Sequence, residues 1–475
     1  MDYPGVMKAL LVLPLVLYVA APPPPQPAAA DGDAAALLEK AESRAEDGKF
    51  REAQRLYRKL AKDFAGTPEG RIGERRSKPS AFLGAADIVR HGDSSNRVDI
   101  VLMGEGYQLK EMKAFTKLAD DLPDYFRRNR TLGEYYSYFN FIRADLVSAD
   151  NGVDGFGREY DTALGGHILG TYAGHVGVNG GEVRRMLDEL PAHDGQAIVF
   201  AKLGVLGSGG GGIATIGGRN MKTTLHEFGH SFGRLSDEYS SETHKRGPTK
   251  ANVNVTDSPD PDRAPWKHFI DAKVPGVDMY QGADGRARGA WRPTANGCIM
   301  GAGEFYCPVC REQIVKLIYS MVDPIDRAEP APHRSRSDEE YVVEGKELVL
   351  EVTAMQPASH MLHVDWWVFP EADAPRSTVS DNSFAAPAKR GRRSTRNPVE
   401  LAPIEAKPDQ RSKGKRDGEH GFRFKRSAFE PGRYRVICRV TDPAKLRGGR
   451  HAWVLKDDRG LLQSEVGWWV RVPAE

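Results

Sequence analysis

The chain has 475 residues, of which 40% are hydrophobic and 28% charged, and 67 basic residues nearly balance 65 acidic ones. This length fits about three domains, and the composition is that of a globular protein, which excludes a mostly disordered or collagen-like chain. A net charge of +2 lacks the basic excess typical of proteins that wrap nucleic acid, so we expect no nucleic-acid partner.

Residues 1–30 predict a signal peptide. A short apolar run at 9–21 follows Lys8 and precedes the small residues 28–30, which form a suitable cleavage site. The run is shorter than the roughly 20 apolar residues that a membrane span needs. We therefore expect a secreted protein, extracellular or periplasmic or at the cell surface, with no membrane span after signal cleavage; an uncleaved anchor is the alternative.

Residues 37–68 predict a short helical hairpin, broken at Asp47-Gly48. Its pattern of small and aromatic residues resembles a single tetratricopeptide-like unit. Because such repeats usually need about three copies to be stable, we expect the hairpin to pack on the main domain rather than to act as a docking module. The mixed, polar residues 70–95 predict a linker or an extended arm.

Three strand-like segments, 97–108, 139–148 and 196–203, alternate with helical segments and predict an α/β arrangement. The glycine run at 208–212 leads into another strand-like segment. A phosphate-binding loop would open a helix instead, so the run favours a hairpin or the rim of a cleft.

The residues that carry chemistry lie in TTLHEFGHSFGRLSDEY, residues 223–239. His226 and His230 are four residues apart, so on a helix they project from one face and can hold one metal ion. Imidazole suits Zn²⁺, which in catalytic sites takes three protein ligands and leaves a position for water. Glu227 then lies beside that water and can take its proton as general base.

The third metal ligand is expected from the acidic pair Asp237-Glu238, which follows the helix-ending Gly233. In metzincins the pattern HExxHxxGxxH, or Asp in the last place, puts the third ligand where this chain has Ser236, a poor zinc ligand. Asp237 is our first choice and Glu238 the second. A glutamate further downstream, as in thermolysin-like enzymes, stays open.

The whole string resembles the IgA-peptidase family of secreted zinc metallopeptidases, whose pattern is HE-x-GHS-F-x-x-L-x-DEY. The resemblance extends over about 97–322, although the family usually has Asp-Gly-Tyr where this chain has Glu105-Gly106-Tyr107. The motif is matched at His226, Glu227, Gly229, His230, Ser231, Phe232, Leu235, Asp237, Glu238 and Tyr239.

This resemblance implies a zinc-dependent endopeptidase of metzincin-like fold, with one catalytic Zn²⁺ and a protein or peptide substrate. Met300 would then be the methionine of a Met-turn beneath the metal. Tyr239 and Tyr306 are candidates for steadying the oxyanion of the tetrahedral intermediate. The glycine-rich segment 207–218 is expected to form the upper edge of the cleft and to pair with an extended substrate.

The four cysteines are too few for a disulfide-built scaffold. Cys307 and Cys310 form a CxxC pair, but the surrounding sequence is not thioredoxin-like, and a second zinc site would need more ligands than are evident. In an exported protein we expect a structural disulfide, with Cys298 joined to Cys307 or Cys310. Cys438 lies in a strand-like segment and is expected to be a buried free thiol.

Residues 340–475, beyond a boundary rich in proline and charge at 323–340, consist of short apolar or alternating runs between turns. They predict an all-β domain of the immunoglobulin-like sandwich type. The basic, polar insert at 375–417 favours a disordered loop over a polyanion-binding patch. The β-domain is a candidate surface for contact with a glycan or a protein.

The predicted fold is therefore an α/β (α+β) zincin or metzincin-like catalytic domain at 95–325, flanked by the helical hairpin and the β-sandwich. The predicted function is secreted zinc-dependent endopeptidase, with Glu227 as the catalytic base and His226, His230 and Asp237 as metal ligands. Two alternatives are a cell-surface binding or adhesion protein with a structural zinc site, and hydrolysis of a non-peptide amide.

Overall fold

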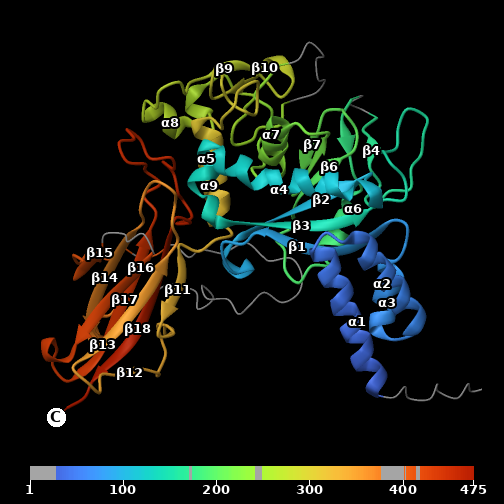
Figure 1. The fold of residues 1–475 in the computed structure, drawn as a ribbon. Coiled ribbons are helices and arrows are strands. Elements are labelled where there is room, and N and C mark those ends of the chain that lie inside the picture. The colour runs from blue at the N-terminus through green and yellow to red at the C-terminus, as the bar shows by residue number, and fades with distance from the viewer. Residues whose placement is uncertain are drawn as a thin grey trace, which may run out of the picture.

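The computed structural model describes residues 28–170, 174–240, 249–375, 401, 403–412 and 418–474. Figure 1 shows three parts: N-terminal helices, a central α/β part, and a C-terminal β part at the end of the central sheet remote from those helices. Most of the predicted signal peptide lies outside the described residues. Within them, every helix is too short or too polar to cross a bilayer.

The N-terminal part consists of three helices, α1 (Ala28–Glu46), α2 (Phe50–Asp63) and α3 (Pro68–Arg76). Gly48, at φ +73°, makes the turn between the first two helices, where the sequence predicted the break. Tyr57 of α2 is buried and its hydroxyl donates a hydrogen bond to the carbonyl of Leu83 in β1 at 2.5 Å. The hairpin therefore packs on the main domain, as expected.

The segment 70–95 is ordered structure and not the expected linker. Besides α3, it contains β1 (Ala81–Val89), which pairs antiparallel with β3 (Phe139–Val147). The register shifts twice along this pair, next to Gly84 and Val89. Such bulges break the two-residue alternation by which a strand is recognised in a sequence.

The central sheet has the strand order β1-β3-β2-β6-β8-β7. Its middle strands, β3, β2 (Val98–Glu105), β6 (Gln196–Ala201) and β8 (Ile213–Gly217), are parallel, and both outer strands are antiparallel to their neighbours. The three strands expected at 97–108, 139–148 and 196–203 are β2, β3 and β6. The glycine run forms β7 (Ser208–Gly210) and its turn into β8, which confirms the predicted hairpin.

Helices cover both faces of this sheet, so β2 and β3 are buried along their whole length. Ile100 and Leu102 face a core shared with α4 (Met112–Arg128), α7 (Met221–Ser231) and α9 (Pro308–Tyr319). Val101 and Met103 face the opposite core, which includes α6 (Gly180–Leu187). Figure 1 shows α4 and α7 side by side over the sheet, and Phe126 meets Phe228 there with ring centroids 5.0 Å apart.

Shorter elements complete the central part. They are α5 (Arg130–Glu134), β4 (His167–Ile168), β5 (Val176–Gly177), α8 (Lys267–Asp271), β9 (Tyr280–Ala283) and β10 (Arg286–Arg292).

The C-terminal part contains two sheets. The first has the order β11-β13-β16, and the second β12-β18-β17-β14-β15. Trp366 of β14 stacks on Phe422 of β16 at 5.4 Å and on Trp468 of β18 at 5.7 Å, so the two sheets share a core. The strands are β11 (Ile325–Glu329), β12 (Tyr341–Val342), β13 (Glu347–Ala354), β14 (His363–Pro370), β15 (Gln410–Ser412), β16 (Glu419–Lys425), β17 (Gly432–Thr441) and β18 (Gln463–Val472).

Two details of the C-terminal part differ from the sequence expectations. β11 pairs with β13, so the β part begins within the segment 323–340 that was expected to be a boundary. Of the insert 375–417, residues 376–400, 402 and 413–417 lie outside the described residues. Gln410–Ser412 within it form β15, which pairs with β14, so these three residues are strand rather than disordered loop.

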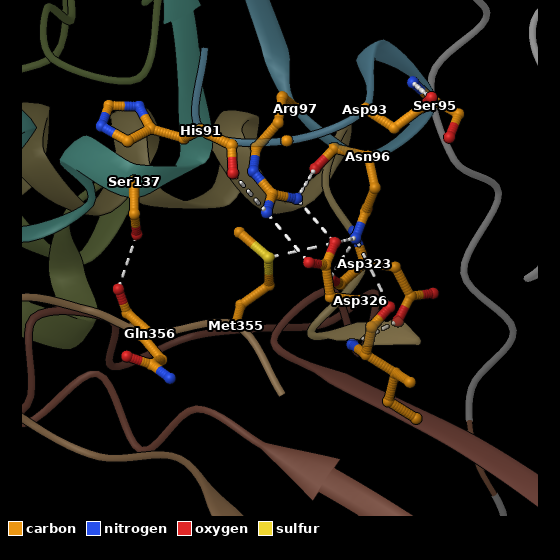
Figure 2. A network of polar contacts seen from close by, with 12 residues as sticks. His91, Asp93, Ser95, Asn96, Arg97, Ser137, Asp323, Asp326, Met355 and Gln356 are labelled. Carbon is orange, nitrogen blue, oxygen red and sulfur yellow. Dashed lines mark hydrogen bonds and ion pairs between the residues drawn. The ribbon is translucent and has the colours of Figure 1, made fainter. Parts of the chain in front are cut away.

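The central and C-terminal parts are joined by polar contacts that Figure 2 shows from close by. The guanidinium of Arg97 donates to both carboxylate oxygens of Asp326, at 2.6 and 2.9 Å. Asn96 accepts a hydrogen bond from the backbone N–H of Asp323 at 2.6 Å, and Ser137 donates to the carbonyl of Gln356 at 2.6 Å. The start of β2 is thus tied directly to the first strand of the β part.

Candidate active site

Helix α7 carries the HExxH residues at the centre of the molecule. Asn220 caps its first turn by accepting a hydrogen bond from the N–H of Thr223 at 3.2 Å. Phe228 faces the core and stacks on Phe232, with ring centroids 4.9 Å apart. Burial of this face directs His226 and His230 toward the opposite side of the helix, which β7 borders.

The turn after α7 differs in detail from the expectation. Gly233 was expected to end the helix, but the left-handed residue of the turn is Arg234, at φ +54°. Glycine is required at position 233 for steric reasons, because a Cβ there would lie 2.5 Å from the carbonyl oxygen of Gly229. The turn brings the chain back so that Asp237 faces the two histidines.

Three ligand atoms converge at this point. The Nε2 atoms of His226 and His230 are 3.1 Å apart, and Oδ1 of Asp237 lies 3.2 Å from each. The side chains are about one-sixth exposed, so an ion held here stays accessible from one side. The structure therefore brings together the three residues that the sequence singled out.

The other ring nitrogen of each histidine is already engaged. His226 Nδ1 lies 2.7 Å from the carbonyl oxygen of Ile299, and His230 Nδ1 lies 2.7 Å from that of Leu235. A carbonyl can only accept, so each Nδ1 carries a hydrogen and each neutral ring has its lone pair on Nε2. This is the arrangement of metal-binding histidines whose orientation is fixed by an outer hydrogen bond.

The donor set fits a metal ion. Oδ1 of Asp237 is buried between the two Nε2 atoms, which cannot donate to it while both rings are neutral, so a bound cation would satisfy all three atoms. Without an ion, burial disfavours the charged form of His226, but Asp237 and the Ile299 carbonyl outweigh burial and raise its pKa to about 9. The two histidines hold the pKa of Asp237 below its usual range, against burial. The site therefore attracts positive charge.

Glu227 lies beside this cluster, on the same helix, and is 7% exposed. Burial raises the pKa of its carboxyl group above the ordinary value, while the charges of His226 and His230 oppose that shift. A Cβ on Gly207 would lie 3.1 Å from Oε1 of Glu227. The carboxylate is thus enclosed between α7 and the segment that leads into β7.

Met300 lies directly beneath the helix. A Cβ on Gly229 would come within 2.3 Å of the Met300 sulfur, so only glycine allows this approach. Met300 therefore packs against the HExxH helix, and its role in a Met-turn beneath the metal stays a prediction. Tyr306, by contrast, is buried and its hydroxyl donates to the carbonyl of Leu225 at 2.6 Å, so its expected role at the oxyanion is wrong. Tyr239 is 39% exposed, and its ring lies 6.2 Å from that of His226. It remains a candidate for stabilising the oxyanion.

Glu105, which stands where the family usually has Asp, holds the neighbouring loop at 162–166 in place. It is fully buried at the end of β2, and its carboxylate accepts hydrogen bonds from the N–H groups of Leu164 and Gly166 and the hydroxyl of Thr162, at 2.9, 2.5 and 2.6 Å. Glu105 is therefore a structural residue outside the histidine cluster.

Sequence reasoning missed a second cluster. Glu238 points away from the histidines and lies with Cys298, Cys307 and Cys310 in a buried group. All four cysteines of the chain are free thiols, so the expected disulfide is not formed, while Cys438 is buried and free as expected. The signals were present as an acidic residue next to the third ligand and as a CxxC pair, but only the fold brings them together.

The fold and the site combine an HExxH helix on an α/β sheet with a third acidic side chain that faces the two histidines, an arrangement that can hold a metal ion. Residues 86–277 match the family model described as IgA Peptidase M64. This region belongs to that family, and the protein is a metallopeptidase, a hydrolase that acts on proteins or peptides. A search of curated proteins found no match to the chain. The family assignment favours an enzyme over the binding or adhesion protein considered from the sequence.

Proposed function

We propose that the protein is a zinc endopeptidase in which His226, His230 and Asp237 hold one catalytic zinc ion and Glu227 is the general base. The observation that carries this proposal is the convergence of three ligand atoms, all within 4.8 Å of one another, beside a buried glutamate. Two imidazoles and one carboxylate form a donor set that suits zinc and leaves a position for water.

When bound, zinc supplies Lewis-acid polarisation of the substrate carbonyl and lowers the pKa of a neighbouring water molecule. The chain supplies the proton transfers. Glu227 takes a proton at its carboxylate as the water oxygen bonds to the carbonyl carbon, and gives it to the amine nitrogen as the C–N bond breaks. Burial raises the pKa of Glu227 above its ordinary value, which favours a group that both takes and returns a proton.

The substrate is proposed to bind as an extended strand along β7. This strand is at the edge of the central sheet and packs against α7. A Cβ on Gly209 would lie 2.3 Å from the Glu227 carbonyl oxygen. The backbone of β7 therefore approaches α7 too closely for any side chain at this position. An added strand would then present its carbonyl groups to the side of α7 that carries the histidines.

The finer fold assignment is part of the proposal. A parallel sheet with an antiparallel edge strand beside the HExxH helix, with a methionine beneath it, supports a metzincin-like catalytic domain. Two facing sheets with a tryptophan-rich core support an immunoglobulin-like sandwich, a candidate surface for contact with a protein or glycan.

Export is proposed from the N-terminal sequence. The apolar run after Lys8 and the small residues 28–30 predict cleavage before Asp31 and a secreted, periplasmic or cell-surface protein. Mass spectrometry of the mature chain from its native host should find Asp31 as the first residue. A chain that keeps its N-terminal 30 residues would contradict this part of the proposal.

The function is tested by digestion of a broad peptide library with the wild type and with Glu227→Gln, with zinc measured in both. We expect Glu227→Gln to keep zinc and to lose at least about a hundredfold in turnover, the lower end of what a general base contributes. Glu304→Gln, which changes an exposed glutamate after Met300, is the matched control and should cleave like the wild type. Equal cleavage by Glu227→Gln would exclude Glu227 as the base.

A further inference from the structure

We propose that Glu238, Cys298, Cys307 and Cys310 form a second metal site, which takes a structural zinc ion. This site is separate from the proposed active site and goes beyond the proposed function. It also replaces the disulfide expected from the sequence.

The separation of two sulfur atoms in the cluster fits one tetrahedral ion. The sulfur atoms of Cys298 and Cys310 are 3.8 Å apart. Two thiolates bound to zinc at about 2.3 Å with tetrahedral angles are separated by about 3.8 Å. A disulfide needs an S–S distance of about 2.05 Å. The Glu238 Oε1 atom completes the group, 2.8 Å from the Cys310 sulfur and 3.5 Å from that of Cys307.

The burial of the group favours a bound cation. Cys310 is fully buried, and Glu238, Cys298 and Cys307 are 4%, 3% and 7% exposed. The other side chains bonded to Glu238 are neutral, the amide of Asn254 at 3.0 Å and the hydroxyl of Thr294 at 3.4 Å. A carboxylate among three sulfur atoms in a protein interior is costly unless it is protonated or bound to a metal.

The backbone around the cysteines is arranged to stabilise thiolates. The N–H of Cys307 donates to the Cys298 sulfur at 3.4 Å, and the N–H of Cys310 donates to the Cys307 sulfur at 3.5 Å. Cys307 is also the N-cap of α9, where the helix dipole favours negative charge. Since a metal binds the thiolate form, these contacts prepare the sulfurs for coordination.

The chemistry of the ligands favours zinc. Three sulfurs and one carboxylate oxygen form a soft, four-membered set, whereas calcium and magnesium need more oxygen ligands. Four protein ligands leave no position for water, which is the property of a structural and not a catalytic zinc site.

The second site fastens the segments that orient the active site. Glu238 follows Asp237 directly, and its backbone N–H donates to the Met300 carbonyl at 2.7 Å. Cys298 precedes Ile299, whose carbonyl oxygen holds the ring of His226. A metal joining Glu238 to Cys298 and to α9 therefore fixes both the third-ligand loop and the loop beneath the helix.

The test is zinc content by mass spectrometry, together with X-ray absorption, on the full chain. We expect two zinc ions in the wild type. His226→Ala, which removes only the active-site metal, should keep one zinc with sulfur neighbours at about 2.3 Å. Cys310→Ser should lower the count by one, and Cys438→Ala, the matched control in β17, should keep both. A His226→Ala chain without sulfur-bound zinc would overturn the proposal.

Thiol counting gives a second readout that does not depend on the folding of a variant. The wild type, unfolded with a chelator and without a reductant, should expose all four thiols, because zinc-bound thiolates are released unoxidised. Two thiols would indicate a disulfide and contradict the metal site. A wild type with one zinc, sulfur-bound and unaffected by His226→Ala, would support this site while contradicting the proposed active-site metal, so the two failures are distinguishable.

Discussion

Two adjacent carboxylates, Asp237 and Glu238, belong to different sites. Asp237 turns toward His226 and His230, while Glu238 turns into the cysteine cluster. The sequence could predict that one of this pair is a metal ligand, because the HExxH pattern requires a third. It could not predict the environment of Glu238, since only the fold brings Cys298 and the start of α9, with Cys307 and Cys310, to this carboxylate.

The Gly229→Ala substitution tests the close approach of Met300 to α7. Alanine favours a helix by about 1 kcal/mol over glycine. The added methyl would lie 2.3 Å from the Met300 sulfur, however, and overpacking of this kind costs about 1–3 kcal/mol. We expect a lower free energy of unfolding in denaturant titration. Gly210→Ala, with no atom within 4 Å of its Cβ, is the control, and a stabilised Gly229→Ala would contradict the contact.

At the scale of elements, the sequence predicted the strands with continuous apolar patterns and missed those with irregular ones. β2, β3 and β6 are buried on both faces, so they are predominantly apolar, although β2 contains Asp99 and β3 contains Arg143 and Asp145. β1 contains two register shifts, which hide its periodicity. The glycine hairpin was predicted correctly because the glycine run at 208–212 is followed by a strand-like segment. A glycine run followed by a helix would instead have indicated a phosphate-binding loop.

The edge strand β7 is the element whose role in substrate binding can be tested. Gly211 and Gly212 have positive φ, so bulky residues there would strain the turn itself. Gly210 has open space around its Cβ and no such constraint. We expect Gly210→Val to keep its metal and to lose about fivefold in kcat/KM for peptides, as from the loss of one hydrogen bond worth about 1 kcal/mol.

Gly345→Val is the matched control for this experiment, since Gly345 also has open space and lies in the β part. Its peptide turnover should equal that of the wild type. If Gly210→Val cleaves peptides as fast as this control, β7 does not pair with the substrate.

At the scale of the whole molecule, a buried ion network holds the β part to the central part. His360 lies between Glu134 of α5 and Asp442, with both contacts at 2.7 Å. Tyr135 and Tyr319 each donate a hydrogen bond to Asp442, at 2.9 and 2.6 Å. The sequence did not indicate this network, because its members are spread over the chain and none belongs to a local motif.

The network predicts a pH dependence of stability. Burial disfavours the charged form of His360, but hydrogen bonds to Asp442 and Glu134 outweigh it and raise the pKa to about 9. The folded pKa lies above the unfolded value of 6.5, so the stabilisation is complete below pH 6.5 and is lost as the pH rises through about 9.

His360→Gln should therefore lower the free energy of unfolding by about 3–5 kcal/mol at pH 6. The deficit relative to the wild type should shrink toward pH 10, as measured by denaturant titration at each pH. His363→Gln, which changes an exposed histidine of β14, is the control. A deficit that does not change with pH would show that His360 is neutral in the folded protein.

Asp237 is proposed to complete a metal site with His226 and His230, and one comparison of two variants tests this proposal. Zinc content and peptide cleavage are measured in Asp237→Ala beside Ser236→Ala, the neighbouring position at which metzincins have their third ligand. We predict that Asp237→Ala loses one zinc ion per chain and its peptide cleavage, while Ser236→Ala keeps both. Full zinc and cleavage in Asp237→Ala would contradict this prediction.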